Sequence, residues 1–256
     1  IGLAIDEIAL LGNAGHGIVV LSNNNRIGGT NANERNSITA NTGNGVQVDA
    51  SATGNALLGN SIWQNSGIGI DLGGDTVSDN DADDTDTGAN NLQNFPELAQ
   101  VTTDESGTLS IAGSLQSSAD TTYRVEFFTS STVDSSGYGG ARTLVGHTSI
   151  TTDQNGAASF EAALEATVAA GEYVTATATV DQGTAGFSDT SEYALSVTAE
   201  ATSPAGNQAP VFSLATGVNQ IDLNANSSDA VDIVRQSDGR YIIASKVNSA
   251  ASSGKW

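Results

Sequence analysis

The sequence predicts an all-β protein in which short stacked strands are followed by an antiparallel β-sandwich and then by a β-hairpin. Three observations lead to this fold class. A pattern of short strands and Asn/Gly corners repeats within residues 36–74. Short alternating runs separated by turn signals fill residues 98–198, and an Asp-Gly turn joins two apolar runs near the end of the chain.

The repeat has the pattern N-S-I-x-x-N-x-G-x-G-[VI]-x-[VL], which occurs twice between Asn36 and Gly74. Seven positions of the first copy recur 24 residues later (36 to 60): Asn36, Ile38, Asn41, Gly43, Gly45, Val46 and Val48 become Asn60, Ile62, Asn65, Gly67, Gly69, Ile70 and Leu72. An earlier copy fits with a shift of 28 (13 to 41): Leu10, Asn13, Gly15, Gly17, Ile18 and Val20. A constant period of this length predicts coils that stack on one another.

The residue types suit such coils. Alternation places Val46 and Val48 on the inner face and Gln47 on the outer face of one short strand. The repeated Asn of successive coils should stack at one corner and hydrogen-bond along the axis: Asn13, Asn41 and Asn65. We expect residues 26–36 to form a loop between coils, and Trp63 to close the core below the last coil.

Four segments in the first two fifths of the chain carry a resemblance: NRIGG (25–29), RNSITANTGNGVQV (35–48), GNSIWQNSGIGIDLGGD (59–75) and TGANNLQNFPEL (87–98). They resemble the right-handed parallel β-helix of the pectate-lyase-like type, in particular the Asn/Gly-rich repeats of large secreted and surface proteins of bacteria. The resemblance implies a β-helix for the first part of the chain. It implies no particular activity, because fold alone does not carry function.

Composition limits the partners. The 256 residues carry 29 acidic and 8 basic side chains, a net charge of −21, so bulk electrostatics exclude nucleic acid and anionic membranes and favour cations. The chain has no Cys and no Met, and it opens on Ile1 in a pattern already under way, which we interpret as a piece of a longer protein. No signal peptide and no long apolar run is visible in the sequence.

An acidic segment, residues 75–91, follows the last repeat. Six carboxylates occur within twelve residues: Asp75, Asp79, Asp81, Asp83, Asp84 and Asp86. They repel one another unless they are solvated or neutralised by a cation. The alternate spacing of Asp79, Asp81 and Asp83 is typical of the start of Ca²⁺ loops.

The segment is not an EF-hand, because the sixth position is Asp84 rather than Gly and the twelfth is Asn90 rather than Glu. We predict a Ca²⁺ site formed by the six aspartates. The alternative is a solvated acidic linker.

The next region, residues 97–199, is predicted to be an Ig-like or fibronectin-like sandwich. Six runs read as strands: 108–115, 122–129, 143–151, 157–163, 173–180 and 193–198. Within the second run, Tyr123, Val125 and Phe127 alternate with Arg124 and Glu126, which predicts one buried face and one solvated face.

The end of the chain divides into a linker and a truncated repeat. Residues 200–208 have linker composition. Residues 209–256 contain AVDIVRQSDGRYIIAS, in which Asp238-Gly239 predicts a hairpin turn. This segment resembles a repeat unit of propeller-like bacterial surface proteins. With the β-helix at 1–96 and the sandwich at 97–199, these are the predicted domains.

A catalytic constellation is not evident. Neither His16 nor His147 stands in a nucleophile motif, so we interpret both as structural. One pair of carboxylates remains as an alternative. Asp49 and Asp71 would both point outward on neighbouring coils, roughly 8 Å apart, which lies within the range for inverting glycoside hydrolysis.

The sequence therefore predicts a non-enzymatic structural or adhesive segment of a large secreted or cell-surface bacterial protein, stabilised by Ca²⁺. The expected partners are a polysaccharide or another surface protein. The alternatives are a fragment of a polysaccharide lyase or glycoside hydrolase, with Asp49 and Asp71 as catalytic residues, and a carbohydrate-binding module. The oligomeric state is open.

Overall fold

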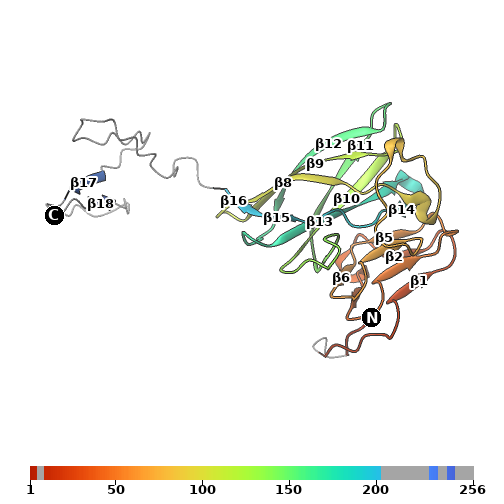
Figure 1. Ribbon diagram of the computed structural model, residues 1–256. Coiled ribbons are helices and arrows are strands. Elements are labelled where there is room, and N and C mark those ends of the chain that lie inside the picture. Colours follow the sequence, from red (N-terminus) through yellow and green to blue (C-terminus); the bar gives the residue numbers. More distant parts are fainter. Residues whose placement is uncertain (5–8, 203–230, 236–240, 246–256) are drawn as a thin grey trace. The chain divides into compact units, whose positions relative to one another are not determined.

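The computed structural model describes residues 1–4, 9–202, 231–235 and 241–245 (Figure 1). The predicted all-β class is confirmed, since the helical turns in the described residues are only three or four residues long. The chain divides into two compact units, residues 1–202 and residues 203–256.

Seven short strands of the first unit form three parallel sheets, which we call the parallel stack. The first sheet has the order β1 (Ile18–Val20), β4 (Val46–Val48) and β7 (Ile70–Leu72). The second pairs β2 (Arg26–Gly28) with β5 (Ala56–Leu58), and the third pairs β3 (Ser37–Thr39) with β6 (Ser61–Trp63). Each turn of the chain thus adds one strand to each sheet in succession.

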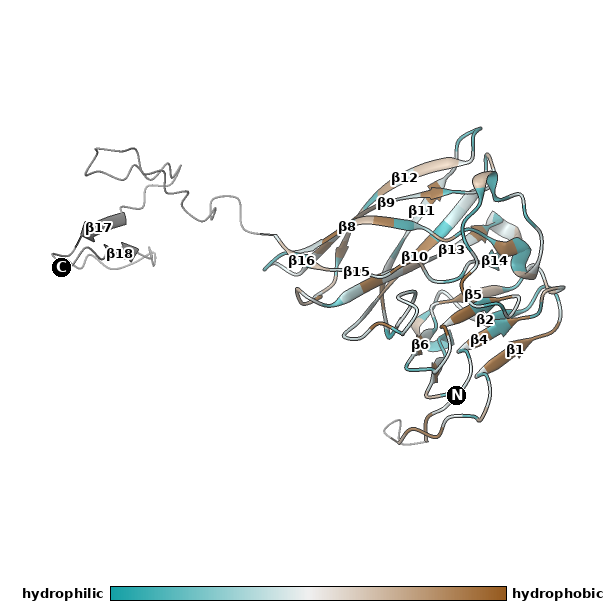
Figure 2. Ribbon diagram, in the orientation of Figure 1, coloured by the Kyte–Doolittle hydropathy of each residue, from teal (hydrophilic) through white to brown (hydrophobic). Residues whose placement is uncertain are grey.

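The register of the parallel stack follows the repeat of the sequence. Ile18 pairs with Val46, and Val46 pairs with Ile70. The inner side chains at these levels are buried together: Val20, Val46, Val48, Ile70 and Leu72. The strands of the stack are largely apolar and the connecting loops largely polar (Figure 2).

Asparagine ladders run along the corners of the stack. As predicted, the Asn13 N–H donates to Asn41 Oδ1 at 3.0 Å, and the Asn41 N–H donates to Asn65 Oδ1 at 3.1 Å. A second ladder joins Asn36 N–H to Asn60 Oδ1 at 3.1 Å. These bonds satisfy backbone donors at corners where the strand ladder is interrupted.

A third ladder was not predicted. The Asn25 N–H donates to Asn55 Oδ1 at 2.9 Å, and the Asn55 N–H donates to Asn90 Oδ1 at 3.0 Å. Asn90 belongs to the acidic segment, so this segment supplies the last rung of a corner of the stack.

The loop predicted for residues 26–36 is only partly correct. Its first three residues form β2, because the Arg26–Gly28 backbone pairs with β5. The offset of this pairing is 30 residues (26 to 56), so the 24-residue repeat did not predict it. The remainder contains the 3₁₀ turn η1 (Ala32–Glu34), and Glu34 forms an exposed ion pair with Arg26 at 2.6 Å.

Two antiparallel sheets follow and form the sandwich. One has the order β11 (Thr143–Thr151), β10 (Thr122–Ser130), β13 (Tyr173–Asp181) and β14 (Phe187–Thr190), with β15 (Val197–Thr198) also paired to β13. The other has the order β12 (Ala157–Glu165), β9 (Thr108–Gln116), β8 (Glu97–Thr103) and β16 (Glu200–Ala201). Short turns η2 (Ala82–Asp84), η3 (Ala89–Leu92) and η4 (Gly183–Ala185) lie in the connections.

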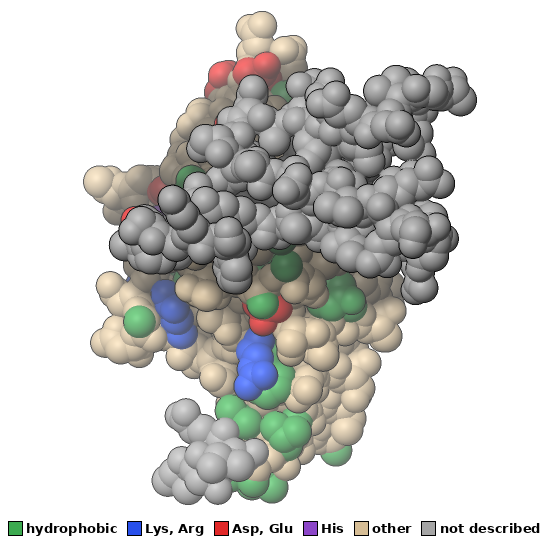
Figure 3. Space-filling view, turned by 90° about the vertical axis from the view of Figure 1, so that its left-hand side faces the viewer, with side chains coloured by type: hydrophobic (Ala, Val, Ile, Leu, Met, Phe, Trp, Pro, Cys, Tyr) green, Lys and Arg blue, Asp and Glu red, His purple; other side chains and the backbone are tan. Residues whose placement is uncertain are grey.

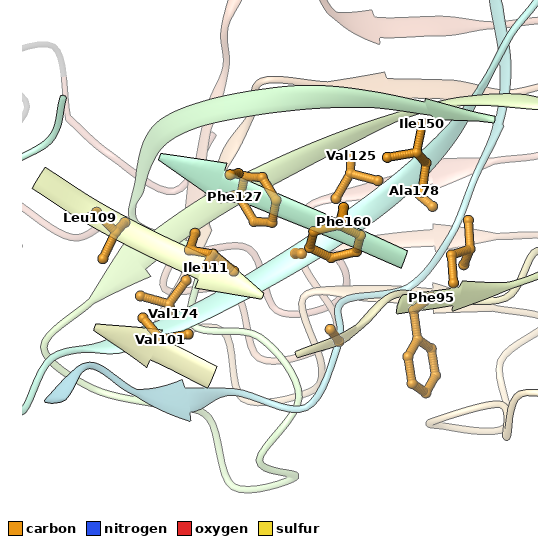
Figure 4. Packing of buried hydrophobic residues seen from close by; sticks show 14 of the residues in the cluster. Phe95, Val101, Leu109, Ile111, Val125, Phe127, Ile150, Phe160, Val174 and Ala178 are labelled. Carbon is orange, nitrogen blue, oxygen red and sulfur yellow. The ribbon is translucent and has the colours of Figure 1, made fainter. Parts of the chain in front are cut away.

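The core of the sandwich lies between these sheets (Figure 4). Aromatic and aliphatic side chains from both sheets meet there: Val101, Leu109, Ile111, Val125, Phe127, Phe160 and Val174. Five of the predicted runs form strands close to the predicted bounds. The run predicted at 193–198 is wrong for its first four residues: the edge strand is β14, and Tyr193 packs into the stack instead.

The prediction of a solvated face on β10 is wrong. Tyr123, Val125 and Phe127 point into the sandwich core as expected. Arg124 and Glu126, however, are 9% and 0% exposed. The β10 sheet lies between the β8–β9–β12 sheet and the parallel stack, so both of its faces are covered (Figure 1).

The last turn of the stack is closed by residues of the sandwich rather than by Trp63. Phe128 and Tyr193 belong to the buried cluster of the stack and meet edge to face, with ring centroids 5.5 Å apart. Trp63 is only half-buried, with the Arg142 guanidinium 4.4 Å above its ring. An aromatic pair remote in sequence therefore takes the role predicted for Trp63.

Side chains of the sandwich also accept backbone hydrogens from the stack. Thr190 Oγ1 accepts from Leu57 N–H at 2.9 Å, and Glu126 Oε2 accepts from Gly59 N–H at 2.7 Å. The Ala141 carbonyl accepts from Ile62 N–H at 2.7 Å. These acceptors replace the strand that would otherwise pair with the last turn.

The second unit contains β17 (Val231–Arg235) and β18 (Tyr241–Ser245). They pair antiparallel, with Val231 opposite Ser245 and Arg235 opposite Tyr241, which confirms the predicted hairpin. The predicted turn residues Asp238 and Gly239, and the rest of the predicted repeat, lie outside the described residues.

The surface of the first unit shows where apolar side chains remain uncovered. Large exposed hydrophobic residues concentrate near the N-terminus and the first turn of the stack: Ile1, Leu10, Leu11, Val19 and Leu21. Figure 3 shows apolar side chains toward the bottom of one face, at the level of the N-terminus. Among the described residues, no helix is long and apolar enough to cross a membrane.

We predict that Phe128→Ala lowers the free energy of unfolding by about 3–5 kcal/mol, because it leaves a cavity under the last turn of the stack. Val19→Ala, at a side chain that is 48% exposed, should change it by under about 1 kcal/mol. Urea denaturation of both variants measures this. Equal effects of the two substitutions would show that Phe128 does not close the stack.

Candidate metal centre

Three of the six predicted metal ligands meet in the acidic segment. Asp81, Asp84 and Asp86 each offer a carboxylate oxygen, and these oxygens lie within 4.8 Å of one another. The sequence spacing i, i+3, i+5 brings them together because Asp83 and Asp84 adopt positive φ angles of 64° and 53°. This local left-handed backbone turns the chain back on itself after Asp81.

Hydrogen bonds join the two ends of the segment that carries the cluster, residues 80–81 and residues 94–95. Asn80 exchanges two hydrogen bonds with the backbone of Phe95: Oδ1 accepts from N–H and Nδ2 donates to the carbonyl, both at 2.9 Å. Asn94 forms the same pair with the backbone of Asp81: Oδ1 accepts from N–H at 3.1 Å, and Nδ2 donates to the carbonyl at 2.8 Å. Two adjacent reciprocal amide-to-backbone pairs therefore close the loop of residues 81–94 that carries the cluster.

The carboxylates use only part of their acceptor capacity within the protein. Asp84 Oδ1 accepts from Asn94 N–H at 2.9 Å, and its Oδ2 accepts from Ser117 Oγ at 2.6 Å. Asp81 Oδ2 accepts from Thr85. Asp81 Oδ1 and Asp86 Oδ1 are buried and have no hydrogen-bond partner among the described residues. Two desolvated anionic oxygens without a donor are costly, and a cation would compensate both.

The electrostatics of the cluster agree with this geometry. Burial raises the pKa of Asp84, and the Asp86 and Asp81 carboxylates raise it further. Burial also raises the pKa of Asp86, and the negative charge of Asp81 raises it further. A cation bound among the three would favour their ionised forms.

The other three predicted ligands lie apart from this cluster. Asp83 Oδ1 accepts a long hydrogen bond from Gln116 Nε2 at 3.3 Å, and Asp79 is exposed. Asp75 is exposed and raises the pKa of Asp71. The alternating trio Asp79, Asp81 and Asp83 is thus not the set that the fold assembles.

The two carboxylates of the catalytic alternative have different surroundings. Asp49 is half-buried and accepts from Ser51 N–H and Oγ at 3.0 and 2.7 Å, which lowers its pKa. Asp71 is 3% exposed and accepts from Gly74 N–H at 2.8 Å and from Asn44 Nδ2. Burial raises the pKa of Asp71.

Sequence reasoning missed a buried acid, Glu192, at the seam between stack and sandwich. Its Oε1 accepts from Leu72 N–H at 2.8 Å and its Oε2 accepts from Ser78 N–H at 2.9 Å. Burial raises the pKa of Glu192 to about 8, and the charges of Asp71 and Asp75 also raise it. No local motif marks Glu192, because its partners are more than a hundred residues away in sequence.

The two histidines have structural surroundings. His16 Nδ1 accepts from Asn44 N–H at 3.0 Å, which joins two successive turns of the stack. His147 lies in β11 opposite Glu126. Partial burial lowers the pKa of His147, and the charge of Arg124 adds to this effect. Neither histidine takes part in the aspartate cluster, which is the only such group among the described residues.

Comparison with known proteins adds no family. No family model matches the sequence, and no curated protein matches it.

We predict that Glu192 makes stability fall with rising pH. Its folded-state pKa of about 8 lies above the ordinary value of 4.5. The folded protein therefore holds a proton that the unfolded chain releases, and this stabilisation is complete below pH 4.5 and lost as pH rises through about 8. Relative to Glu192→Gln, the wild type should lose a few kcal/mol between about pH 5 and pH 9.

Urea denaturation across this pH range, with the exposed Glu161→Gln as the control, isolates the contribution of Glu192. The comparison concerns the slope with pH, because Gln offers only one acceptor to the two N–H donors. Parallel stability profiles for the wild type and Glu192→Gln would contradict the prediction.

Proposed function

We propose that the chain is a structural segment whose acidic junction is stabilised by a divalent cation, Ca²⁺. The observation that carries the proposal is the cluster of Asp81, Asp84 and Asp86, with two buried, unpartnered oxygens. Ca²⁺ takes six to eight oxygen ligands at about 2.4 Å, so oxygens on one ion lie up to about 5 Å apart. The 4.8 Å spread of the cluster fits this requirement.

The choice of Ca²⁺ rests on the donor set. All the candidate ligands are carboxylate oxygens, which hard cations prefer, and no Cys is present in the chain. Mg²⁺ demands tighter octahedral geometry and retains its waters, whereas Ca²⁺ accepts irregular sites in loops. A cation at this position would neutralise charges that repel one another.

The position of the cluster gives the ion a mechanical role. On one side, Asn90 Nδ2 donates to the carbonyls of Asn55 in the stack and Thr190 in the sandwich, at 2.8 and 3.0 Å. On the other side, Asn94 Nδ2 donates to the carbonyl of Gln116 at 2.8 Å. Fixing the segment between Asn90 and Asp81 therefore stiffens the junction of the two layers.

The parallel stack supports the resemblance to β-helix repeats, since its strands pair at the predicted offsets of 28 and 24 residues. Together with the resemblance of the C-terminal segment to propeller-like repeats, this favours a place in a large secreted or cell-surface bacterial protein. There the chain would act as a spacer or an adhesive element. Its partner would be a polysaccharide or another surface protein.

The enzyme alternatives receive less support. A glycoside hydrolase needs two accessible carboxylates that face one substrate. Asp71 is buried, with both carboxylate oxygens engaged by Asn44 and Gly74, whereas Asp49 is held by Ser51. A polysaccharide lyase would need a basic residue near the cation, and the Arg26 side chain is paired with Glu34.

We predict that Ca²⁺ raises the thermal midpoint relative to a chelator. Binding to the folded state alone adds about 2.7 kcal/mol of stability when the ion is at a hundredfold excess over its dissociation constant. The doubly substituted Asp81→Asn/Asp86→Asn variant should lose this increase. Calorimetry with Ca²⁺, with Mg²⁺ and with chelator provides the measurement.

The matched control is Asp79→Asn, which removes the same charge from an exposed position of the same segment outside the cluster. It should retain the increase. If Ca²⁺ does not change the thermal midpoint of the wild type, the proposal fails and the acidic segment is a solvated linker. A response that survives in the double variant would place the ion elsewhere.

A further inference from the structure

A polar pocket opens beside the aspartate cluster. It has a volume of about 380 Å³ and is lined by Asp84 and Asp86 from the cluster, by Asn91 and Gln93 from η3 and its C-terminal side, and by Ser188 and Asp189 from β14. Tyr123 and Val180 form its inner wall at the end of the sandwich. The pocket is large enough for a single sugar ring, and it is continuous with the proposed cation site through Asp84 and Asp86.

Ser188 is the feature that hydrogen bonding within the protein does not explain. It is only 6% exposed, and its Oγ has no hydrogen-bond partner within the part of the chain that the structure describes. The strand register places Ser188 opposite Val180, which also lines the pocket, so the hydroxyl lies on the pocket side of β14. A buried hydroxyl without a partner costs stability unless something supplies one.

The lining selects the charge of the ligand. It includes three carboxylates, those of Asp84, Asp86 and Asp189, and no basic side chain. Anionic ligands are therefore disfavoured. The remaining polar side chains carry hydroxyls and amides, which both donate and accept: Asn91, Gln93, Ser118, Thr121, Tyr123, Gln182 and Ser188. Such groups suit a neutral ligand that carries several hydroxyls.

We propose that this pocket binds a single neutral sugar residue whose vicinal hydroxyls coordinate the Ca²⁺ held by Asp81, Asp84 and Asp86. The proposal rests on the proposed function, because it takes the same ion as given. Three aspartates do not fill the six to eight positions of Ca²⁺, so the pocket side of the ion remains open to external oxygens. Ser188, Gln182 and Asn91 would bind the remaining hydroxyls.

A sugar fits better than an organic amine. An ammonium group would compete with the cation for Asp84 and Asp86, whereas a neutral diol is itself a ligand of Ca²⁺. A diol also offers a hydrogen-bond partner to the buried hydroxyl of Ser188. Ion and sugar should therefore bind cooperatively.

The test is titration calorimetry with methyl α-mannoside, methyl α-glucoside and methyl β-galactoside, each with Ca²⁺ and with chelator. We expect at least one of the glycosides to bind in Ca²⁺ and none in chelator. Linkage requires that this glycoside raise the affinity for Ca²⁺ by the same factor as Ca²⁺ raises the affinity for the glycoside. Binding that is equal in chelator would overturn the proposal.

The variant that tests the pocket is Ser188→Val, which puts two methyl groups in place of the unpartnered hydroxyl. Glycoside affinity should fall by roughly tenfold or more. Gln182→Ala, at an exposed lining position, should also weaken glycoside binding. Ser110→Val, on an exposed position of β9, is the matched control and should bind as the wild type does.

The two proposals fail in different ways. If Ca²⁺ does not raise the thermal midpoint, the proposed function fails, and this inference fails with it. If Ca²⁺ raises the midpoint equally in the wild type and Ser188→Val but no glycoside binds, the cation site stands and the sugar site is refuted. Glycoside binding that neither Ser188→Val nor Gln182→Ala weakens would also refute it.

Discussion

The constraint on which the structure depends is the open edge of the last turn of the parallel stack. Stacked strands leave a row of unpaired backbone donors and an uncovered apolar end wherever the stack stops. Here the sandwich supplies both the acceptors, through Thr190, Glu126 and Glu192, and the apolar cover, through Phe128 and Tyr193. Stack and sandwich therefore share one seam, and residues 1–202 form one compact unit.

This seam explains why charged residues are buried in the middle of a sheet. Arg124 Nε donates to Glu126 Oε1 at 2.9 Å, and Glu126 uses its other oxygen to accept from Gly59 N–H. A buried ion pair is a weak source of stability, because desolvation offsets its attraction. The ion pair orients the Glu126 carboxylate. This carboxylate accepts a hydrogen bond from Gly59 N–H, which a further strand of the stack would otherwise pair with. From the sequence, the side chains of β10 should alternate between a buried face and a solvated face. In the structure, they alternate between two buried faces.

Sequence reasoning succeeded where interactions repeat locally or at a fixed offset. The inner positions Val46 and Ile70, the Asn41 ladder and the strands of the sandwich all follow from period and turn chemistry. It failed at the seam, since Tyr193 and Glu192 act on residues more than a hundred positions away. The acidic segment lies between these cases. Composition identifies its aspartates, but the positive φ angles that select Asp81, Asp84 and Asp86 from the six are not encoded by any Gly.

The acidic segment is more than a connection between two layers. Asn90, at its end, continues a ladder that begins at Asn25, so the segment completes a corner of the stack before the chain enters the sandwich. The same residue bonds to Thr190, whose hydroxyl accepts from Leu57. The position of the aspartates is thus fixed by the same hydrogen bonds that end the stack. An ion bound there would add its binding free energy to the folded state, because Asp84, which accepts from Ser117 of the sandwich, belongs to the cluster.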